Sequence, residues 1–291
     1  MSAAAENGWA VGEMWGDRPR TTVRWHAGQA EEIGLAFDRA TTLKDVNSAG
    51  VAVGWAGFSD DRQAIVYRNG QYAYLPFPGD KGNSYALAVN NAGDAVGMVE
   101  PTGKSRDIVV WPGSGGAPRV ITLPGDYAWT YAADIDEQGR ALVYGAYRNA
   151  WGYDAYVWSP SGTVTKVEPA DKNNPTVLPE RLRNNRVLAR TGHGDTWTEF
   201  HLDTGEALPY DTTGTSMVID SGYTTAGVVN DYANSRQNLT VWEHARVKQV
   251  LATADGWGDP LQAAGLTDDG TLAFTQRTGA TTRASTFTRH C

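Results

Sequence analysis

The chain contains a single cysteine, Cys291, at the last of its 291 positions. One thiol forms no internal disulfide and supplies no cysteine-based zinc site, so neither device organises the fold. Long apolar runs are missing as well, and none approaches the roughly 18 residues that a membrane-spanning helix requires. We therefore expect no membrane span.

Positive charge is also in short supply. Lys and Arg number 25 against 33 Asp and Glu, which gives a formal net charge of −8. Because binding to phosphate backbones requires clustered cations, a general nucleic-acid-binding role is disfavoured. An acidic surface of this size is typical of soluble proteins that stay dispersed, and we expect a monomer.

Glycine and tryptophan are abundant, with 33 and 11 residues. Many of them belong to a short sequence motif that recurs along the chain, which we call the phrase. Each copy has a tight turn, then a small residue and Val-Gly, then an aromatic residue. The turn glycines of the clear copies are Gly8, Gly50, Gly93 and Gly139. The aromatic landmarks are Trp25, Tyr67, Trp111, Trp158, His201, Trp242 and Phe287. Weaker copies have their turns at Arg186, Tyr223 and Gly270. The turns recur every 37 to 47 residues and the aromatic landmarks every 41 to 47, which indicates seven repeats that stack on one another.

The repeats run from end to end and leave no room for a domain boundary, so we expect a single domain. Their limits are 1–40, 41–83, 84–129, 130–174, 175–213, 214–257 and 258–291. Repeats one to four are regular, and repeats five to seven are supported mainly by their spacing.

The third repeat shows how one unit is built. Its four strand-like runs are SYALAVN, DAVGMV, RDIVVW and RVITLP, each bounded by Gly, Pro, Asn or Asp. Four antiparallel strands in about 42 residues correspond to one propeller blade. We predict an all-β, seven-bladed β-propeller, with a β-solenoid as the alternative. The seventh repeat ends after its third strand, so that blade is expected to have three strands unless the chain continues.

The Val-Gly pairs of the phrase, such as Val53-Gly54 and Val96-Gly97, are interpreted as packing positions. Small residues there are expected to let neighbouring blades approach closely near the centre of the ring. The aromatic residue of the third strand is expected farther out, where the space between blades widens and needs volume.

The phrase x-[IV]-N-x-x-G-x-x-V-G, followed by A-x-x-W-x-x-G, resembles the bacterial HAF-repeat family. The His-Ala-Phe tripeptide of that family is replaced here, in QAIVY, RDIVVW and DAYVW. The resemblance implies a propeller fold and an extracellular location, and it brings no catalytic residues. The first residues, MSAAAE, have neither the basic stretch nor the apolar core of a signal peptide, so the sequence leaves a cytoplasmic location open.

The unusual residues gather in the loops between second and third strands and in those between repeats. In a four-stranded blade both sets of loops lie on one face, where function is usually found. The candidate binding residues on this face are Trp15, Trp55, Phe58, Asp80, Trp129, Trp151, Tyr153, His193, Trp197, Tyr232 and Trp257. Exposed aromatic rings beside planar polar groups suit a sugar, so we predict binding of carbohydrate or of a surface partner. About half of the tryptophans are expected to serve packing instead.

The alternative is an enzyme, either a glycan hydrolase or lyase or a small-molecule tailoring enzyme. Glycosidic acid–base chemistry requires two carboxyl groups about 5 to 10 Å apart, and no pair stands out among the many aspartates. The catalytic residues therefore stay unknown, and the sequence does not decide whether the protein is an enzyme. His193 and Asp195 make weak evidence for a metal, so we expect neither a metal nor a cofactor. A purely structural scaffold is the third possibility.

Overall fold

The structure is a computed structural model. It describes residues 2–14, 21–27, 29–79, 82–103, 105–169, 175–192, 196–210, 214–220, 222–255, 261–278 and 281–288. The chain divides into two compact units, an N-terminal unit (Ser2–Val167) and a C-terminal unit (Glu168–Cys291).

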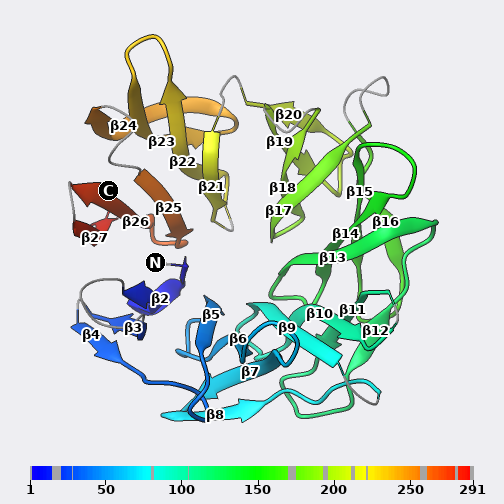
Figure 1. The fold of residues 1–291 in the computed structure, drawn as a ribbon. Coiled ribbons are helices and arrows are strands. Elements are labelled where there is room, and N and C mark those ends of the chain that lie inside the picture. Colours follow the sequence, from blue (N-terminus) through cyan, green and yellow to red (C-terminus); the bar gives the residue numbers. More distant parts are fainter. Residues whose placement is uncertain are drawn as a thin grey trace. The chain divides into compact units, whose positions relative to one another are not determined.

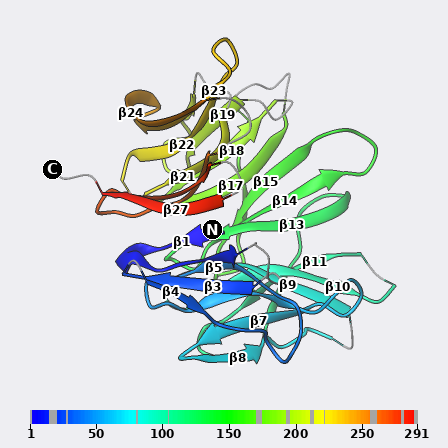
Figure 2. The same cartoon turned by 60° about the vertical axis from the view of Figure 1, so that its left-hand side comes forward.

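The N-terminal unit consists of four antiparallel four-stranded sheets in chain order (Figure 1). Blade one contains β1 (Ala3–Ala4), β2 (Ala10–Met14), β3 (Thr21–His26) and β4 (Gln29–Glu32). Blade two contains β5 (Thr41–Val46), β6 (Ala52–Ala56), β7 (Gln63–Arg68) and β8 (Gln71–Tyr74). Blade three contains β9 (Gly82–Val89), β10 (Ala95–Pro101), β11 (Asp107–Trp111) and β12 (Arg119–Ile121). Blade four contains β13 (Tyr127–Ile135), β14 (Ala141–Tyr147), β15 (Tyr153–Trp158) and β16 (Val164–Lys166), and its long strands lie side by side in Figure 2.

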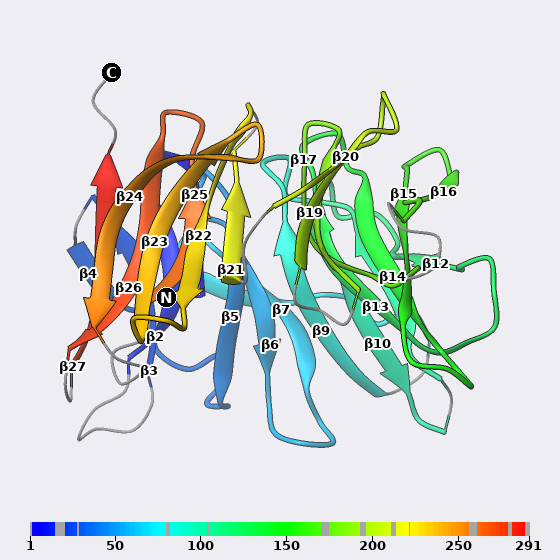
Figure 3. The ribbon, with the colours of Figure 1, turned by 90° about the horizontal axis from the view of Figure 1, so that it is seen from above.

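The C-terminal unit continues the pattern with two four-stranded sheets and one three-stranded sheet. Blade five contains β17 (Val177–Arg183), β18 (Arg186–Thr191), β19 (Thr196–His201) and β20 (Ala207–Pro209). Blade six contains β21 (Gly214–Ile219), β22 (Thr224–Asp231), β23 (Arg236–Glu243) and β24 (Arg246–Asp255), drawn in yellow to orange in Figure 3. The last sheet contains β25 (Leu261–Leu266), β26 (Thr271–Thr278) and β27 (Thr281–Thr288). The only helical element in the described ranges is a 3-10 turn at Glu6–Gly8, and none of their helices could cross a bilayer.

The prediction of antiparallel four-stranded blades is confirmed, and the predicted number of seven is wrong. Six sheets have four strands, and the seventh has only three. The seventh repeat supplies only three strands, β25 to β27, as expected from its sequence. In the third repeat all four expected runs form strands, at β9 to β12.

A β-bulge in the first strand explains the glycine of the repeated phrase. In blade three Val96 pairs with Ala88 and Gly97 with Ala86, so Leu87 is the extra residue. A Cβ on Gly97 would lie 1.9 Å from the carbonyl oxygen of Tyr85. The glycine is therefore required because the strand beside it bulges toward it.

The same arrangement occurs in blade two, where Lys44 is the bulged residue and Gly54 lies opposite. A Cβ on Gly54 would lie 1.9 Å from the carbonyl oxygen of Thr42. In both blades the close neighbour is a strand of the same sheet. These glycines are therefore required within their own sheet, a role that the sequence did not predict.

The asparagine of the phrase joins consecutive blades. The side-chain oxygen of Asn47 accepts hydrogen bonds from the backbone N–H groups of Ala49 and Val51, each at 3.0 Å, and so closes its own turn. Its amide nitrogen donates to the carbonyl of Asn90 in blade three. Asn90 donates in turn to the carbonyl of Asp136 in blade four at 3.0 Å. All three side chains are buried, so the turns of blades two to four form one hydrogen-bonded ladder.

Apolar side chains fill the space between consecutive sheets. One cluster combines Val53 and Ala64 of blade two with Val89 and Trp111 of blade three. Trp111 is fully buried, and its indole N–H donates to the carbonyl of Pro76 at 2.7 Å. Burying a ring of this size supplies much of the free energy that holds two sheets together. The aromatic landmark of the repeat thus has the packing role expected from its position.

Candidate functional site

A continuous row of aromatic and charged side chains crosses blades two, three and four in the N-terminal unit. We call this row the belt. Its members are Lys44, Trp55, Arg62, Tyr85, Glu100, Arg106, Trp129, Tyr131, Tyr144, Trp151 and Tyr153. Within each blade these residues lie toward one end of the sheet, where first strands begin and second strands end.

The first part of the belt consists of two rings flanked by two cations. Trp55 meets Tyr85 edge to face, with 5.5 Å between ring centroids and 76° between planes. The ammonium of Lys44 lies 5.9 Å from the Trp55 ring, and the guanidinium of Arg62 lies 5.7 Å from the Tyr85 ring. Both distances permit cation–π attraction, which orients the two long side chains along the rings.

The centre of the belt is an ion pair. The hydroxyl of Tyr85 donates to Glu100 at 3.1 Å, and the Nε of Arg106 donates to the other carboxylate oxygen at 2.8 Å. Burial raises the pKa of Glu100, but the hydrogen bond and charge of Arg106 outweigh it and leave the pKa below its ordinary value. Glu100 is therefore an ionised hydrogen-bond acceptor at neutral pH.

The last part of the belt is almost wholly aromatic. The guanidinium of Arg106 lies 4.9 Å from the Tyr131 ring and 5.7 Å from the Trp129 ring. Tyr131 stacks on Tyr144, with 4.9 Å between centroids and 15° between planes. Tyr153 meets Tyr144 edge to face at 5.6 Å. Each ring is thus held in place by a neighbour.

Two tryptophans of the belt remain open to solvent. Trp129 is 53% exposed and Trp151 is 64% exposed. Trp151 contacts the edge of Tyr153, with 6.4 Å between centroids. Trp129 lies beside the guanidinium of the ion pair, and Trp151 lies at the other end of the aromatic part of the belt.

The structure brings together four of the residues that the sequence nominated: Trp55, Trp129, Trp151 and Tyr153. Phe58 is 70% exposed in the loop before β7 and outside the belt. Tyr232 is 67% exposed in the turn between β22 and β23 of the C-terminal unit. The nominated residues Trp15, Asp80, His193 and Trp257 lie outside the described residues.

The prediction that Trp197 is a binding residue is wrong. Its side chain is only 2% exposed, so it is unable to serve as an exposed binding residue. It lies on β19 and packs with Tyr210, Met217 and Trp242 in the core between blades five and six. Its ring fills the space between two sheets, as that of Trp111 does between blades two and three.

Seven members of the belt were not among the binding residues nominated from the sequence: Lys44, Arg62, Tyr85, Glu100, Arg106, Tyr131 and Tyr144. Alternation along β13 is the one signal that could have found part of this set. Trp129 and Tyr131 are two residues apart in a strand, so their side chains point to the same face. The contacts of Tyr85 and Glu100 depend on strand register, which the sequence pattern does not specify.

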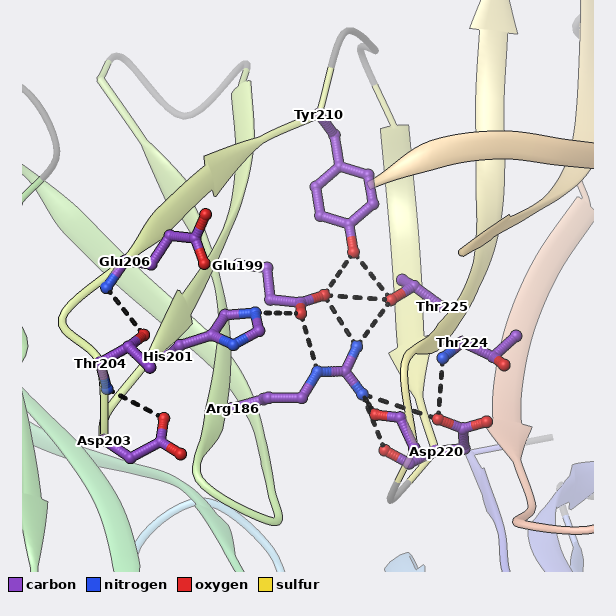
Figure 4. Close-up of polar contacts among 11 residues, drawn as sticks. Arg186, Glu199, His201, Asp203, Thr204, Glu206, Tyr210, Asp220, Thr224 and Thr225 are labelled. Atoms are coloured by element: carbon purple, nitrogen blue, oxygen red, sulfur yellow. Dashed lines mark hydrogen bonds and ion pairs between the residues drawn. The ribbon is translucent and has the colours of Figure 1, made fainter. Parts of the chain in front are cut away.

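A second polar cluster lies in the C-terminal unit, around the buried guanidinium of Arg186 (Figure 4). Its Nε and Nη2 donate to the two carboxylate oxygens of Glu199, at 2.7 and 2.8 Å. Its Nη1 donates to the carbonyls of Asp220, at 3.4 Å, and of Gly222. The hydroxyl of Tyr210 donates to Glu199 at 2.6 Å.

The charges in this cluster compensate one another. Burial raises the pKa of Glu199 and lowers that of Arg186, but their mutual hydrogen bonds and attraction outweigh burial in both. The net shifts therefore favour the charged forms, with a lowered pKa for Glu199 and a raised pKa for Arg186. Because its bonds run from blade five to the turn of blade six, we assign the cluster a structural role.

Metal binding receives no support from the described part of the chain. No three His, Cys, Asp or Glu side chains come together there in a way that could hold an ion.

Comparisons with known proteins bear on the fold. No family model and no curated protein sequence matches the chain. Among solved structures, it is similar to a streptogramin B lyase, with a TM-score of 0.60 and 13% identity over 94% of this chain and 88% of that one. A virginiamycin B lyase from Staphylococcus aureus aligns with a TM-score of 0.57 and 13% identity over 93% of this chain and 92% of that one.

A puromycin hydrolase aligns with a TM-score of 0.62 and 14% identity over 94% of this chain. The alignment covers 49% of the hydrolase, so the chain spans about half of that protein's length. At these identities the likeness concerns the fold alone: an all-β β-propeller with antiparallel four-stranded blades.

Proposed function

We propose that this protein is a carbohydrate-binding β-propeller and that the belt is its binding surface. The observation that carries the proposal is the position of Trp129 and Trp151, both more than half exposed, on either side of an aromatic row anchored by Arg106 and Glu100. The C–H face of a sugar ring stacks on an indole, while a carboxylate and a guanidinium bond its hydroxyls.

The belt suits this role because its rings are already ordered. Tyr131 is fixed between Arg106 and Tyr144, and Tyr153 is fixed between Tyr144 and Trp151. Side chains held by their neighbours lose little conformational entropy when a ligand arrives. This small entropy loss matters most for a ligand that forms weak contacts, such as a sugar.

Catalysis at the belt has less support than binding. Glu100 is an ionised acceptor paired with Arg106, and a carboxyl in that state is a poor general acid. The neighbouring Asp154 accepts hydrogen bonds from Tyr127 and Tyr147. Burial raises the pKa of Asp154, but bonds from Lys166 and the two tyrosines hold it below its ordinary value.

The proposal includes an extracellular location and action as a monomer. The resemblance to bacterial HAF repeats supports the location. Detection of the protein in the culture medium of its native cells would test the location, and sedimentation equilibrium would test the monomer.

Binding measurements on single-residue variants test the function. A panel of neutral and acidic oligosaccharides is screened with the full chain, and the hits are titrated calorimetrically into Trp129→Ala and Trp151→Ala. Each substitution is expected to weaken binding by about tenfold, because a stacking platform is lost. The matched control is Tyr232→Ala, which removes a similarly exposed ring from the C-terminal unit and should bind as the unaltered protein does. Failure to bind any glycan, or equal binding by the tryptophan variants, would overturn the proposal.

A further inference from the structure

We infer that the carbohydrate bound by the belt is acidic, with carboxylate or sulfate groups that contact Lys44 and Arg62. The inference rests on the proposed function and specifies the class of ligand. Its basis is the charge of the belt, which is opposite in sign to that of the whole chain.

The belt carries three cations and one carboxylate. Arg106 and Glu100 neutralise each other in their ion pair, which leaves Lys44 and Arg62. In the described ranges neither of these two has a carboxylate within ion-pair distance. Five other cations of the N-terminal unit pair with carboxylates, namely Arg24, Arg39, Arg140, Arg148 and Lys166, whereas Arg119 bonds to a backbone carbonyl. The local excess of positive charge contrasts with a chain whose formal net charge is −8.

The backbone directs Lys44 toward the belt. It is the extra residue of the bulge in β5, between the pairs formed by Leu43 and Asp45. A bulge re-aims the side chain of its extra residue, and this one leaves the exposed ammonium 5.9 Å from the Trp55 ring.

Arg62 is held on the other side of the same ring pair. Its guanidinium lies 5.7 Å from the Tyr85 ring, and its Nη1 is 3.5 Å from the Tyr85 hydroxyl. Arg62 as a whole is half-buried. A guanidinium fixed along an aromatic face keeps its planar fork available for a carboxylate or a sulfate.

An acidic sugar fits both elements of the belt at once. In an acidic oligosaccharide, one ring can stack on an exposed indole while another ring places its anionic group at the two cations beside Trp55 and Tyr85. Because Lys44 and Arg62 contact water, their attraction for an anion is expected to weaken as salt rises.

Calorimetry with matched ligands tests the inference on the full chain. The ligands are tetragalacturonate, its uncharged methyl ester and a sulfated carrageenan tetrasaccharide. At least one acidic ligand is expected to bind about tenfold more tightly than the ester in dilute buffer, with the preference shrinking in 0.5 M salt. Lys44→Ala and Arg62→Ala should each reduce that preference at least about threefold. Arg119→Ala, which removes an exposed cation outside the belt, should leave it unchanged.

Each outcome has a separate meaning. Tighter binding of tetragalacturonate or of the carrageenan decides between carboxylate and sulfate. If the methyl ester binds as tightly as both acids, and Trp129→Ala still weakens it, the acidic class is wrong while carbohydrate binding stands. If neither the acids nor any neutral glycan of the panel binds, the inference and the proposed function both fail.

Discussion

The side-chain amide of Asn47 donates a hydrogen bond of 2.9 Å to the backbone carbonyl of Asn90, which lies 43 positions away. Asn90 repeats the contact with Asp136 one blade further on. Between blades five and six the equivalent carbonyl is that of Asp220, and there the donor is the guanidinium of Arg186. The connection between turns thus persists where the asparagine of the phrase has been lost.

Asn90→Ala is expected to destabilise the protein by about 2 to 3 kcal/mol. The substitution removes the buried amide and leaves the carbonyl of Asp136 and the N–H of Asp94 without their partner. Asn91→Ala is the control, because its side chain is exposed and its loss should cost less than about 1 kcal/mol. Urea unfolding measures both, and equal effects would contradict the buried ladder.

Gly97→Ala is expected to cost about 2 to 3 kcal/mol, since the new Cβ would meet the backbone carbonyl of Tyr85 at 1.9 Å. Backbone atoms of a bulged strand have little freedom to move away. Gly116→Ala is the matched control, because a Cβ there meets nothing closer than 3.7 Å. The unfolding temperature of Gly97→Ala should therefore lie clearly below that of Gly116→Ala. Equal unfolding temperatures would show that the backbone at the bulge can move away from the new Cβ.

Glu199→Gln is expected to lower stability at neutral pH by about 3 kcal/mol, because Arg186 loses its charged partner in the core. The folded pKa of Glu199 lies below its ordinary 4.5, so the unfolded chain binds the proton first as the pH falls. The stabilisation is complete above about pH 4.5 and is lost as the pH decreases through the folded pKa.

The difference between the unaltered protein and Glu199→Gln should therefore shrink below about pH 4.5 in urea-unfolding curves. Glu206→Gln serves as the control, because it removes an exposed carboxylate from the turn after β19 and should have almost no effect. A difference that stays constant down to pH 3 would contradict the lowered pKa.

The repeat predicted the blades well because its signals are local. Turns such as 90–93 and alternating runs such as 84–90 depend on neighbouring residues, and they lie where the sequence placed them. The sequence could not explain why position 97 must be glycine, because the requirement comes from a one-residue shift in the pairing of β10 with β9. Such a shift is invisible in a pattern of residue types.

The candidate site was predictable only in part. Trp129 and Trp151 could be nominated from their loops, but Trp197 has the same residue type and is buried by blade six. Arg186 stands at the turn position of the fifth repeat, and no local pattern indicates that its guanidinium donates to four acceptor groups from two blades. Contacts between residues far apart in sequence decide both cases.

The belt as a carbohydrate-binding surface is tested most directly by following the indole N–H signals of the eleven tryptophans in nuclear magnetic resonance spectra. Tetragalacturonate and its methyl ester are titrated into the labelled chain, with signals assigned by Trp129→Phe and Trp151→Phe. We predict that a bound glycan shifts the signals of Trp129 and Trp151 and leaves those of the buried Trp111 and Trp242 unchanged. Unchanged Trp129 and Trp151 signals in the presence of a glycan that binds would contradict the account.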